Sequence, residues 1–314
     1  MMNGVITLGE ALIDFTPLDD NNMEFKKSPG GAPANVAVGL SRLGVETSFL
    51  GKVGDDVLGN FLKKTLEDNE VNTAEMLLTD EARTGLTFVT LDEEGDRSFS
   101  FYIDPSADRF LRPEEINEGI FKENKILHFG SISLIDEPAR SATKYAVQQA
   151  KENGMLVSYD PNLRMNLWKD AETAKARIVS VLDDVDILKI SEEELEFITG
   201  TLEVEAGVEE LAVEYEIPLI YVTWGNKGAY YYYQGQLEFV SALDVNSVDT
   251  TGAGDAFVSG VLYQINQTEQ SLAELESEFL DKTIKLASIS GGLAVSEKGA
   301  MAALPTLDEI EAQL

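Results

Sequence analysis

The sequence predicts an α/β fold with three layers, in which helices cover both faces of a mainly parallel central sheet. Apolar runs of strand length alternate with segments of helical periodicity over most of the chain, as is typical of βαβ units. The chain has 314 residues, of which 44% are apolar, enough to bury a large core. No repeat, low-complexity run or linker divides it, so we expect a single domain over residues 1–314.

The predicted elements follow one another in βα order. Short apolar runs that end in glycine or turn residues indicate the strands, and apolar residues three or four positions apart indicate the helices. The expected strands are 4–10, 46–54, 125–130, 155–162, 185–191 and 218–225; the expected helices are 32–44, 56–69, 137–153, 171–182, 192–198 and 256–265. Ligands of such folds bind where the parallel strands end at their carboxyl side.

One region departs from this order. Residues 84–102 alternate with period two on both sides of a Glu94-Gly95 turn, which predicts a β-hairpin. Residues 11–20 also lack a helical pattern. We expect segments of about 11–28 and 84–108 to form a small inserted β-sheet, which could serve as a lid over a binding cleft or as a dimer contact.

The charge balance narrows the range of partners. The chain carries 24 basic and 56 acidic residues, a net charge of −32, which repels nucleic acid and anionic membranes. An anionic substrate would therefore need local positive potential from Mg²⁺, helix N-termini or a few placed cations. The N-terminus lacks the pattern of a signal peptide, and no apolar run is long enough to span a membrane, so we predict a cytoplasmic protein.

The residue types available for catalysis are few. The absence of cysteine excludes disulfides and thiolate metal sites, and a single histidine, His128, argues against a catalytic triad or a multi-histidine metal site. His128 ends an apolar run and is interpreted as a packed residue. Acid–base chemistry must then rest on aspartate, glutamate, lysine or tyrosine.

Residues 249–257, DTTGAGDAF, place three small residues before a helix. They form either a tight turn or a cradle in which backbone N–H groups and the helix dipole hold a phosphate. Asp255 would then start the helix and could accept a hydroxyl proton during phosphoryl transfer. Because no Gly-Lys-Ser/Thr follows, this is not a Walker A loop.

Three further patterns each leave a structural and a functional interpretation open. Gly30 and Gly31 precede a helix and Asn35 lies in its first turn, so Asn35 is a ligand for a polyol or part of a capped loop. Arg164 follows a strand and is a phosphate clamp or a surface arginine. Residues 222–233 predict a strand, a glycine turn and a second strand; they could line a nucleotide pocket, with Lys227 reaching phosphates, whereas the four successive tyrosines indicate strand packing.

Ser191 and Glu194 are three positions apart at a helix start. The spacing places both side chains on one face, where they could hold a Mg²⁺-bound water. A capping box, in which each side chain bonds the other residue's backbone, fits the same spacing.

Residues 30–37 (GGAPANVA) and 249–257 together resemble the two sequence motifs of the ribokinase-like (PfkB) carbohydrate kinase family. The resemblance covers essentially the whole chain, and within the family GEALIDF, LHFGSISL and ISEEELEFITG are most similar to fructokinases. It implies a Rossmann-like domain with a β-lid, commonly paired in a homodimer through the lids. It also implies ATP-dependent phosphorylation of a sugar, here the C6 hydroxyl of fructose.

The resemblance also assigns roles to individual positions. The implied catalytic residues are Asp255 as base, Gly252, Ala253 and Gly254 as anion hole, and Arg164 beside the transferred phosphate. The implied sugar-binding residues are Asp14, Gly30, Gly31, Asn35, Phe101, Arg164 and Asp255, and the implied ATP-binding residues are Lys189, Thr223, Gly225, Gly228, Gly252 and Gly254. The implied metal sites are a Mg²⁺ site reached through water at Glu194 and a K⁺ site at Asp249, Thr251, Ala294, Glu297 and Gly299.

Three positions depart from the family pattern. Ser191 replaces the asparagine of an Asn-x-x-Glu metal motif, and Ala303 replaces a serine that often completes the cation site. Ile103 stands where fructokinases often have arginine, which favours a neutral sugar. The alternatives are 2-keto-3-deoxygluconate kinase, another sugar kinase of the family, or a non-catalytic regulator that binds sugar or nucleotide.

Overall fold

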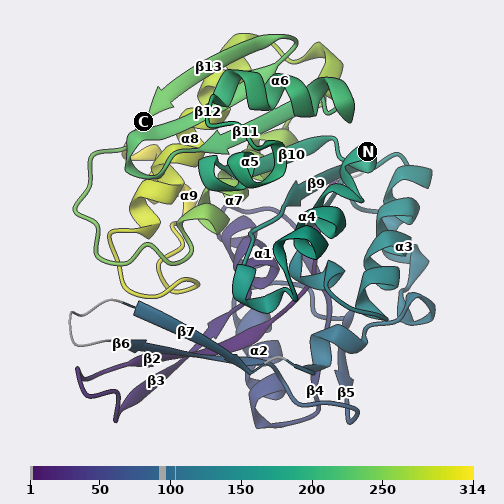
Figure 1. Cartoon of the computed structure of the whole chain (residues 1–314), viewed down its shortest axis with the longest axis vertical. Helices are drawn as coiled ribbons and strands as arrows, with labels where there is room; N and C mark the ends of the chain where they lie inside the picture. Colours follow the sequence, from purple (N-terminus) through teal and green to yellow (C-terminus); the bar gives the residue numbers. More distant parts are fainter. Residues whose placement is uncertain (1–2, 92–96, 103) are drawn as a thin grey trace.

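Two β-sheets organise the protein in the computed structural model, which describes residues 3–91, 97–102 and 104–314 (Figure 1). The large sheet has nine strands in the order β13-β12-β11-β10-β9-β8-β1-β4-β5. Its strands are β1 (Val5–Leu8), β4 (Thr47–Gly54), β5 (Met76–Thr79), β8 (Ile126–Gly130), β9 (Leu156–Asp160), β10 (Ile187–Ser191), β11 (Leu219–Thr223), β12 (Gly228–Tyr233) and β13 (Gln236–Ser241). Seven neighbours run parallel from β5 to β11, and β12 and β13 are antiparallel additions at one edge.

Helices cover both faces of the large sheet. They are α1 (Ala32–Arg42), α2 (Val57–Asp68), α3 (Ala139–Glu152), α4 (Ala171–Val179), α5 (Glu192–Thr199), α6 (Val204–Glu214), α7 (Ala253–Gln267), α8 (Ser277–Ala294) and α9 (Leu307–Glu311). Apolar side chains of α3, α5 and α6 share one buried cluster with the sheet, and those of α1, α7 and α8 share another. The three-layer α/β fold predicted from the sequence is therefore confirmed.

The small sheet contains four strands in the order β3-β2-β6-β7, and it projects from one end of the molecule (Figure 1). They are β2 (Leu12–Pro17), β3 (Phe25–Gly30), β6 (Leu86–Leu91) and β7 (Arg97–Tyr102). The predicted hairpin corresponds to β6 and β7; its turn at Glu94-Gly95 and Ile103 lie outside the described residues.

The register of the small sheet gives its two faces different characters. Asp14 pairs with Thr87, and Thr87 pairs with Phe101, so these three side chains share one face. Phe15 stacks on Phe88 at a centroid distance of 4.9 Å on the opposite face. The face with Asp14 and Thr87 is therefore polar, and the opposite face is aromatic.

Several boundaries differ from those expected. Gly30 ends β3 and is not a loop residue, because its backbone pairs with Leu12. Helix α7 begins at Ala253, three residues before the predicted start, so Ala253 and Gly254 belong to its first turn. The sequence patterns did not identify β5, β13, α6, α8 and α9. Within the described residues, no helix combines the length and apolarity needed to cross a membrane.

Candidate active site

Asp255 occupies the first turn of α7, near the centre of the molecule. Its side chain is 7% exposed, and the Asn35 amide on α1 donates to its Oδ2 over 2.8 Å. Burial raises the pKa of Asp255 to about 6; the Asn35 hydrogen bond lowers it and the nearby Asp160 carboxylate raises it. A carboxylate with this pKa is ionised at neutral pH and still basic enough to accept a proton.

The turn before α7 has the conformation of an anion site. Gly252 has φ of 85°, and a Cβ there would lie 2.9 Å from Ala300 Cα, so a side chain would meet backbone. The first-turn N–H groups of a helix lack intrahelical partners and favour negative charge. The Ala253 N–H donates to Thr250 O over a long 3.3 Å, a weak bond that a better acceptor can replace.

Lys189 supplies a positive charge beside this turn. A Cβ on Gly254 would lie 3.3 Å from Lys189 Nζ, and Nζ is 2.9 Å from Asp160 Oδ2. Burial opposes the charged form of Lys189, but the Asp160 and Glu194 carboxylates outweigh it and raise the pKa of the ammonium. Sequence analysis missed Asp160, although it stands where β9 ends, at the carboxyl edge of the sheet.

The sugar-binding candidates surround the same carboxylate from the small sheet and α1. Burial raises the pKa of Asp14 to about 6, whereas the Thr87 hydroxyl and the Arg164 charge lower it. Arg164 also lowers the pKa of Asp255, so this cation lies near both carboxylates. A Cβ on Gly30 would lie 2.2 Å from Asp14 Oδ2, so a side chain there would displace the Asp14 carboxylate.

Phe101 and Gly31 complete this group. Phe101 is half-buried and lies in the row of Asp14 on the polar face of the small sheet. Gly31 has φ of 102° and precedes α1, which carries Asn35. The structure therefore brings Asp14, Gly30, Gly31 and Asn35 together near Asp255, and Phe101 shares the sheet face of Asp14.

Glu194 forms the capping box that the sequence left as one alternative. Its Oε2 accepts the Ser191 N–H over 2.8 Å, and Ser191 Oγ accepts the Glu194 N–H over 3.1 Å. Oε1 also accepts the Leu163 N–H over 2.7 Å. Each carboxylate oxygen retains a second lone pair, so a metal-bound water can still donate to Glu194.

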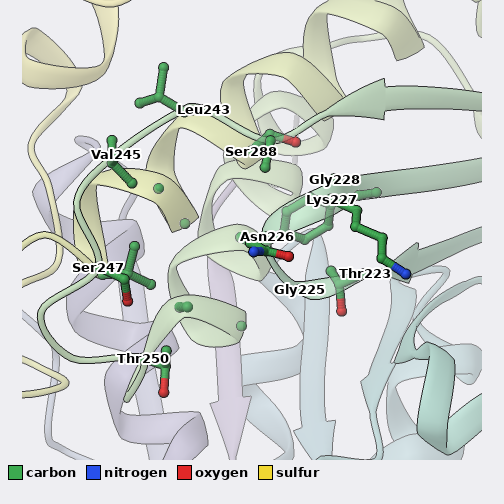
Figure 2. Close-up of a pocket in the computed structure, with 18 of the residues that line it drawn as sticks. Thr223, Gly225, Asn226, Lys227, Gly228, Leu243, Val245, Ser247, Thr250 and Ser288 are labelled. Atoms are coloured by element: carbon green, nitrogen blue, oxygen red, sulfur yellow. The ribbon is translucent and has the colours of Figure 1, made fainter.

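A cavity of about 670 Å³ opens next to the α7 entrance (Figure 2). Its walls include Thr223, Gly225 and Gly228 of the β11–β12 turn together with Ala253 and Gly254, whereas Gly252 and Lys189 lie outside the lining. Figure 2 shows the Lys227 side chain beside this turn, and its Nζ lies 3.8 Å from the centroid of the Trp224 ring. The cavity has the size and the glycine-rich wall of a nucleotide site.

The expected cation-site residues gather in part beside the turn before α7. Asp249 Oδ1 accepts the Thr251 hydroxyl over 2.7 Å, and Asp249 Oδ2 accepts the Gly299 N–H over 3.1 Å. Ala294 ends α8, and Glu297 lies in the loop that follows. The described residues contain no cluster of three or more acidic or histidine side chains that could hold a metal ion.

His128 is a packed residue, as predicted. It is 2% exposed, and its Nδ1 lies 3.0 Å from Ser158 Oγ. Burial lowers the pKa of His128 to about 4, so the imidazole is neutral at physiological pH.

A buried basic carboxylate at a helix N-terminus, with an ammonium group and a nucleotide-sized cavity beside it, is suited to phosphoryl transfer. The family model described as "pfkB family carbohydrate kinase" matches residues 2–307. The chain belongs to this family.

Curated relatives and solved structures agree with that assignment. "Probable fructokinase-2" from Arabidopsis thaliana is 45% identical over 96% of this chain and 93% of its own length. A crystal structure of fructokinase from Xylella fastidiosa with bound ATP has a TM-score of 0.93 at 34% identity, covering 99% of this chain and 98% of that one. A fructokinase double mutant from Vibrio cholerae O395, bound to fructose, ADP and potassium, has a TM-score of 0.91 at 40% identity, covering 99% and 98%.

Proposed function

We propose that the protein is an ATP-dependent fructokinase that transfers the γ-phosphoryl group of ATP to the C6 hydroxyl of fructose. The observation that carries this proposal is the buried Asp255 carboxylate, with a pKa of about 6, between the sugar-side residues and the cavity. The similarity to fructokinases over almost the whole chain supports fructose as the acceptor.

In the proposed mechanism, Asp255 accepts the proton of the C6 hydroxyl while the oxygen of that hydroxyl forms a bond to the γ-phosphorus. The bond between that phosphorus and the β–γ bridging oxygen breaks, and ADP leaves with the electron pair. The N–H groups at Gly252, Ala253 and Gly254 would stabilise the charge on the transferred group. The Lys189 ammonium, 3.3 Å from a Cβ position on Gly254, and Arg164 would add positive charge there.

The sugar would lie on the polar face of the small sheet. Asp14 and Asn35 would form hydrogen bonds with the sugar, and Gly30 and Gly31 would let it approach the backbone closely. The Phe101 ring would cover an apolar face of the sugar ring. The nucleotide would occupy the cavity bounded by Thr223, Gly225 and Gly228. The small sheet, over about 11–28 and 84–108, would then act as a lid of a single kinase domain.

We also infer that the nucleotide binds as its Mg²⁺ complex, because the net charge of −32 disfavours a free polyphosphate. Glu194 would hold that ion through a water molecule, which its remaining lone pairs allow. K⁺ would bind between the loop of Asp249 and Thr251 and the loop of Ala294, Glu297 and Gly299; Ala303 offers no side-chain ligand. The Vibrio cholerae relative, bound to potassium, supports this part of the proposal.

The aromatic face of the small sheet supports a homodimer that pairs through the lids. Tyr102 is 62% exposed at the margin of the Phe15–Phe88 stack, and Met23 is 79% exposed nearby in sequence to Phe25. An aromatic surface of this kind is typical of interfaces.

We expect the enzyme to act in the cytoplasm.

A sugar panel with ATP and Mg²⁺, run with and without K⁺, tests the proposal. We expect fructose to be the preferred acceptor, with the product identified as the 6-phosphate by ³¹P–¹H NMR, and K⁺ to raise turnover. Preference for 2-keto-3-deoxygluconate or another sugar would refute the fructokinase assignment. Binding of sugar and nucleotide without any phosphoryl transfer would indicate a regulator.

A further inference from the structure

Glu10 lies where the chain leaves β1 for the small sheet, and the proposed mechanism does not use it. The residue is 3% exposed. Its Oε1 accepts the Ala32 N–H over 3.2 Å, whereas its buried Oε2 has no hydrogen-bond partner among the described residues. A buried carboxyl oxygen without a hydrogen bond lowers the stability of the fold, so its presence calls for a physical explanation.

The Glu10 side chain caps the start of α1, although Glu10 lies outside that helix. The N-cap residue, Gly31, has no side chain to cap with, and the first turn contains no acidic residue. A Cβ on Gly31 would lie 2.4 Å from Glu10 O, so the Glu10 backbone also packs against this turn. Because Pro33 has no N–H, the Ala32 N–H is one of the few donors in the first turn that a cap can satisfy.

A chain of contacts connects this cap to the proposed catalytic base. The Asn35 N–H donates to Gly31 O over 2.8 Å, which fixes the first full turn of α1. The Asn35 amide then donates to Asp255 Oδ2 over 2.8 Å, and its own Oδ1 has no partner among the described residues. The orientation of the Asn35 amide, and with it the Asp255 carboxylate, therefore depends on where the first turn of α1 lies.

The carboxyl of Glu10 is suited to this role as a neutral acid. Burial raises the pKa of Glu10 to about 8; its own backbone N–H and that of Ala32 lower the pKa, and the Asp108 and Asp255 carboxylates raise it. Glutamine reproduces the shape and hydrogen-bonding groups of a neutral carboxyl. The two substitutions Glu10→Gln and Glu10→Ala thus separate loss of ionisation from loss of the cap.

We propose that Glu10 is a positioning residue, which caps α1 from the β1–β2 connection and, through Asn35, orients Asp255 for proton transfer. The inference rests on the proposed role of Asp255 as the base. It adds a residue outside the proposed sugar- and nucleotide-binding sets to the machinery of phosphoryl transfer.

The test is a double-mutant cycle between Glu10 and Asn35, with exposed Glu209→Ala on α6 as the matched control. We expect Glu10→Ala to lower kcat about 10- to 100-fold, the range that misplacement of a reacting group produces. Glu10→Gln should retain kcat within about threefold, because it keeps the acceptor for the Ala32 N–H. If Glu10 acts through Asn35, adding Glu10→Ala to Asn35→Ala should cause little further loss.

The pH profile of kcat gives a second readout that a structural role would not move. The Asn35 hydrogen bond lowers the pKa of Asp255, so its weakening in Glu10→Ala should move the acid limb to higher pH. The other charges that face Asp255, namely Asp160, Lys189, Arg164 and Asp14, are unchanged in each variant, and Glu10 itself, with a pKa of about 8, is neutral at the pH of the acid limb. Glu10→Gln should leave the limb in place.

Additive losses in the cycle, or a lower melting temperature with unchanged kcat and acid limb, would overturn the inference. Equal damage from Glu10→Gln would show that charge, not the cap, is needed, and would also overturn it. If Glu10→Ala fails to fold, Ala32→Pro removes the donor at a position where proline is tolerated, and the same changes are expected. Asp255→Asn, measured in parallel, reports separately on the proposed function: if it keeps normal turnover, the base assignment itself is wrong.

Discussion

The two ends of the candidate active site are built on different principles. At the sugar end, partial or full burial raises the pKa values of the Glu10, Asp14 and Asp255 carboxyl groups. At the nucleotide end, backbone shape dominates, with φ of 52° at Gly225 and 142° at Gly228. Burial therefore sets the proton chemistry at one end, and glycine conformations set the shape of the cavity at the other.

This difference separates what each kind of substitution can change. A side-chain exchange at Asp14 or Asp255 alters charge and proton affinity at the sugar end. An added Cβ at the nucleotide end alters the backbone itself and therefore the cavity. Rate and nucleotide affinity should consequently respond to different sets of variants.

The largest effect should come from Asp255→Asn, which keeps the shape of the side chain and removes the base. We expect kcat to fall about 10²- to 10⁴-fold, the usual contribution of general base catalysis, with nucleotide Kd nearly unchanged. Stopped assays and calorimetry measure the two quantities, and exposed Asp308→Asn on α9 is the control. Near-normal turnover in Asp255→Asn would mean that the buried Asp255 carboxylate does not set the proton chemistry at the sugar end.

The second effect should come from Gly228→Ala. Its φ of 142° is unfavourable for alanine, and the new Cβ would lie 2.1 Å from Val240 O. Strain of this kind costs about 1–3 kcal/mol, so nucleotide Kd should rise about 10- to 100-fold while sugar affinity is retained. Gly235→Ala is the control, since its φ is also positive but its Cβ would meet nothing within 4 Å. Similar nucleotide binding in the two variants would show that the cavity does not depend on the position 228 backbone.

The sequence could predict the elements whose patterns are local. The alternation of strands and helices, the capping box of Ser191 and Glu194, and the packed His128 all follow from spacing or from an apolar neighbourhood. The pairing of Asp160 with Lys189 could not be predicted, because it joins two strands 29 positions apart. The contact of Glu10 with Ala32 likewise depends on how the chain returns from the small sheet.

The third prediction concerns the free energy of unfolding, which reports the effect of burying the Asp255 carboxylate separately from its effect on the reaction rate. The pKa of Asp255 is about 6 in the folded protein against a usual 3.8, so the folded state binds the proton more tightly. Stability therefore falls as pH rises from about 4 to 6, and above pH 6 the ionised carboxylate costs up to about 3 kcal/mol.

Asp255→Asn should remove that cost. Its free energy of unfolding should exceed that of the wild type at pH 8 and match it near pH 4, as measured by urea denaturation at both values. A variant less stable than the wild type at pH 8 would mean that Asn35 and Lys189 stabilise the charge more than burial opposes it.

The smallest effect should come from Lys227→Ala at the nucleotide end. Lys227 is exposed, lines the cavity and lies over the Trp224 ring, so its ammonium would approach the phosphates of a bound nucleotide from solvent. Removing an exposed cation costs about 0.5–1 kcal/mol, which corresponds to a nucleotide Kd about two- to fivefold higher, and salt should shrink the difference. Exposed Lys282→Ala on α8 controls for the change in net charge. A loss larger than that of Gly228→Ala would reverse the comparison, because side-chain charge and not backbone shape would then govern the nucleotide end.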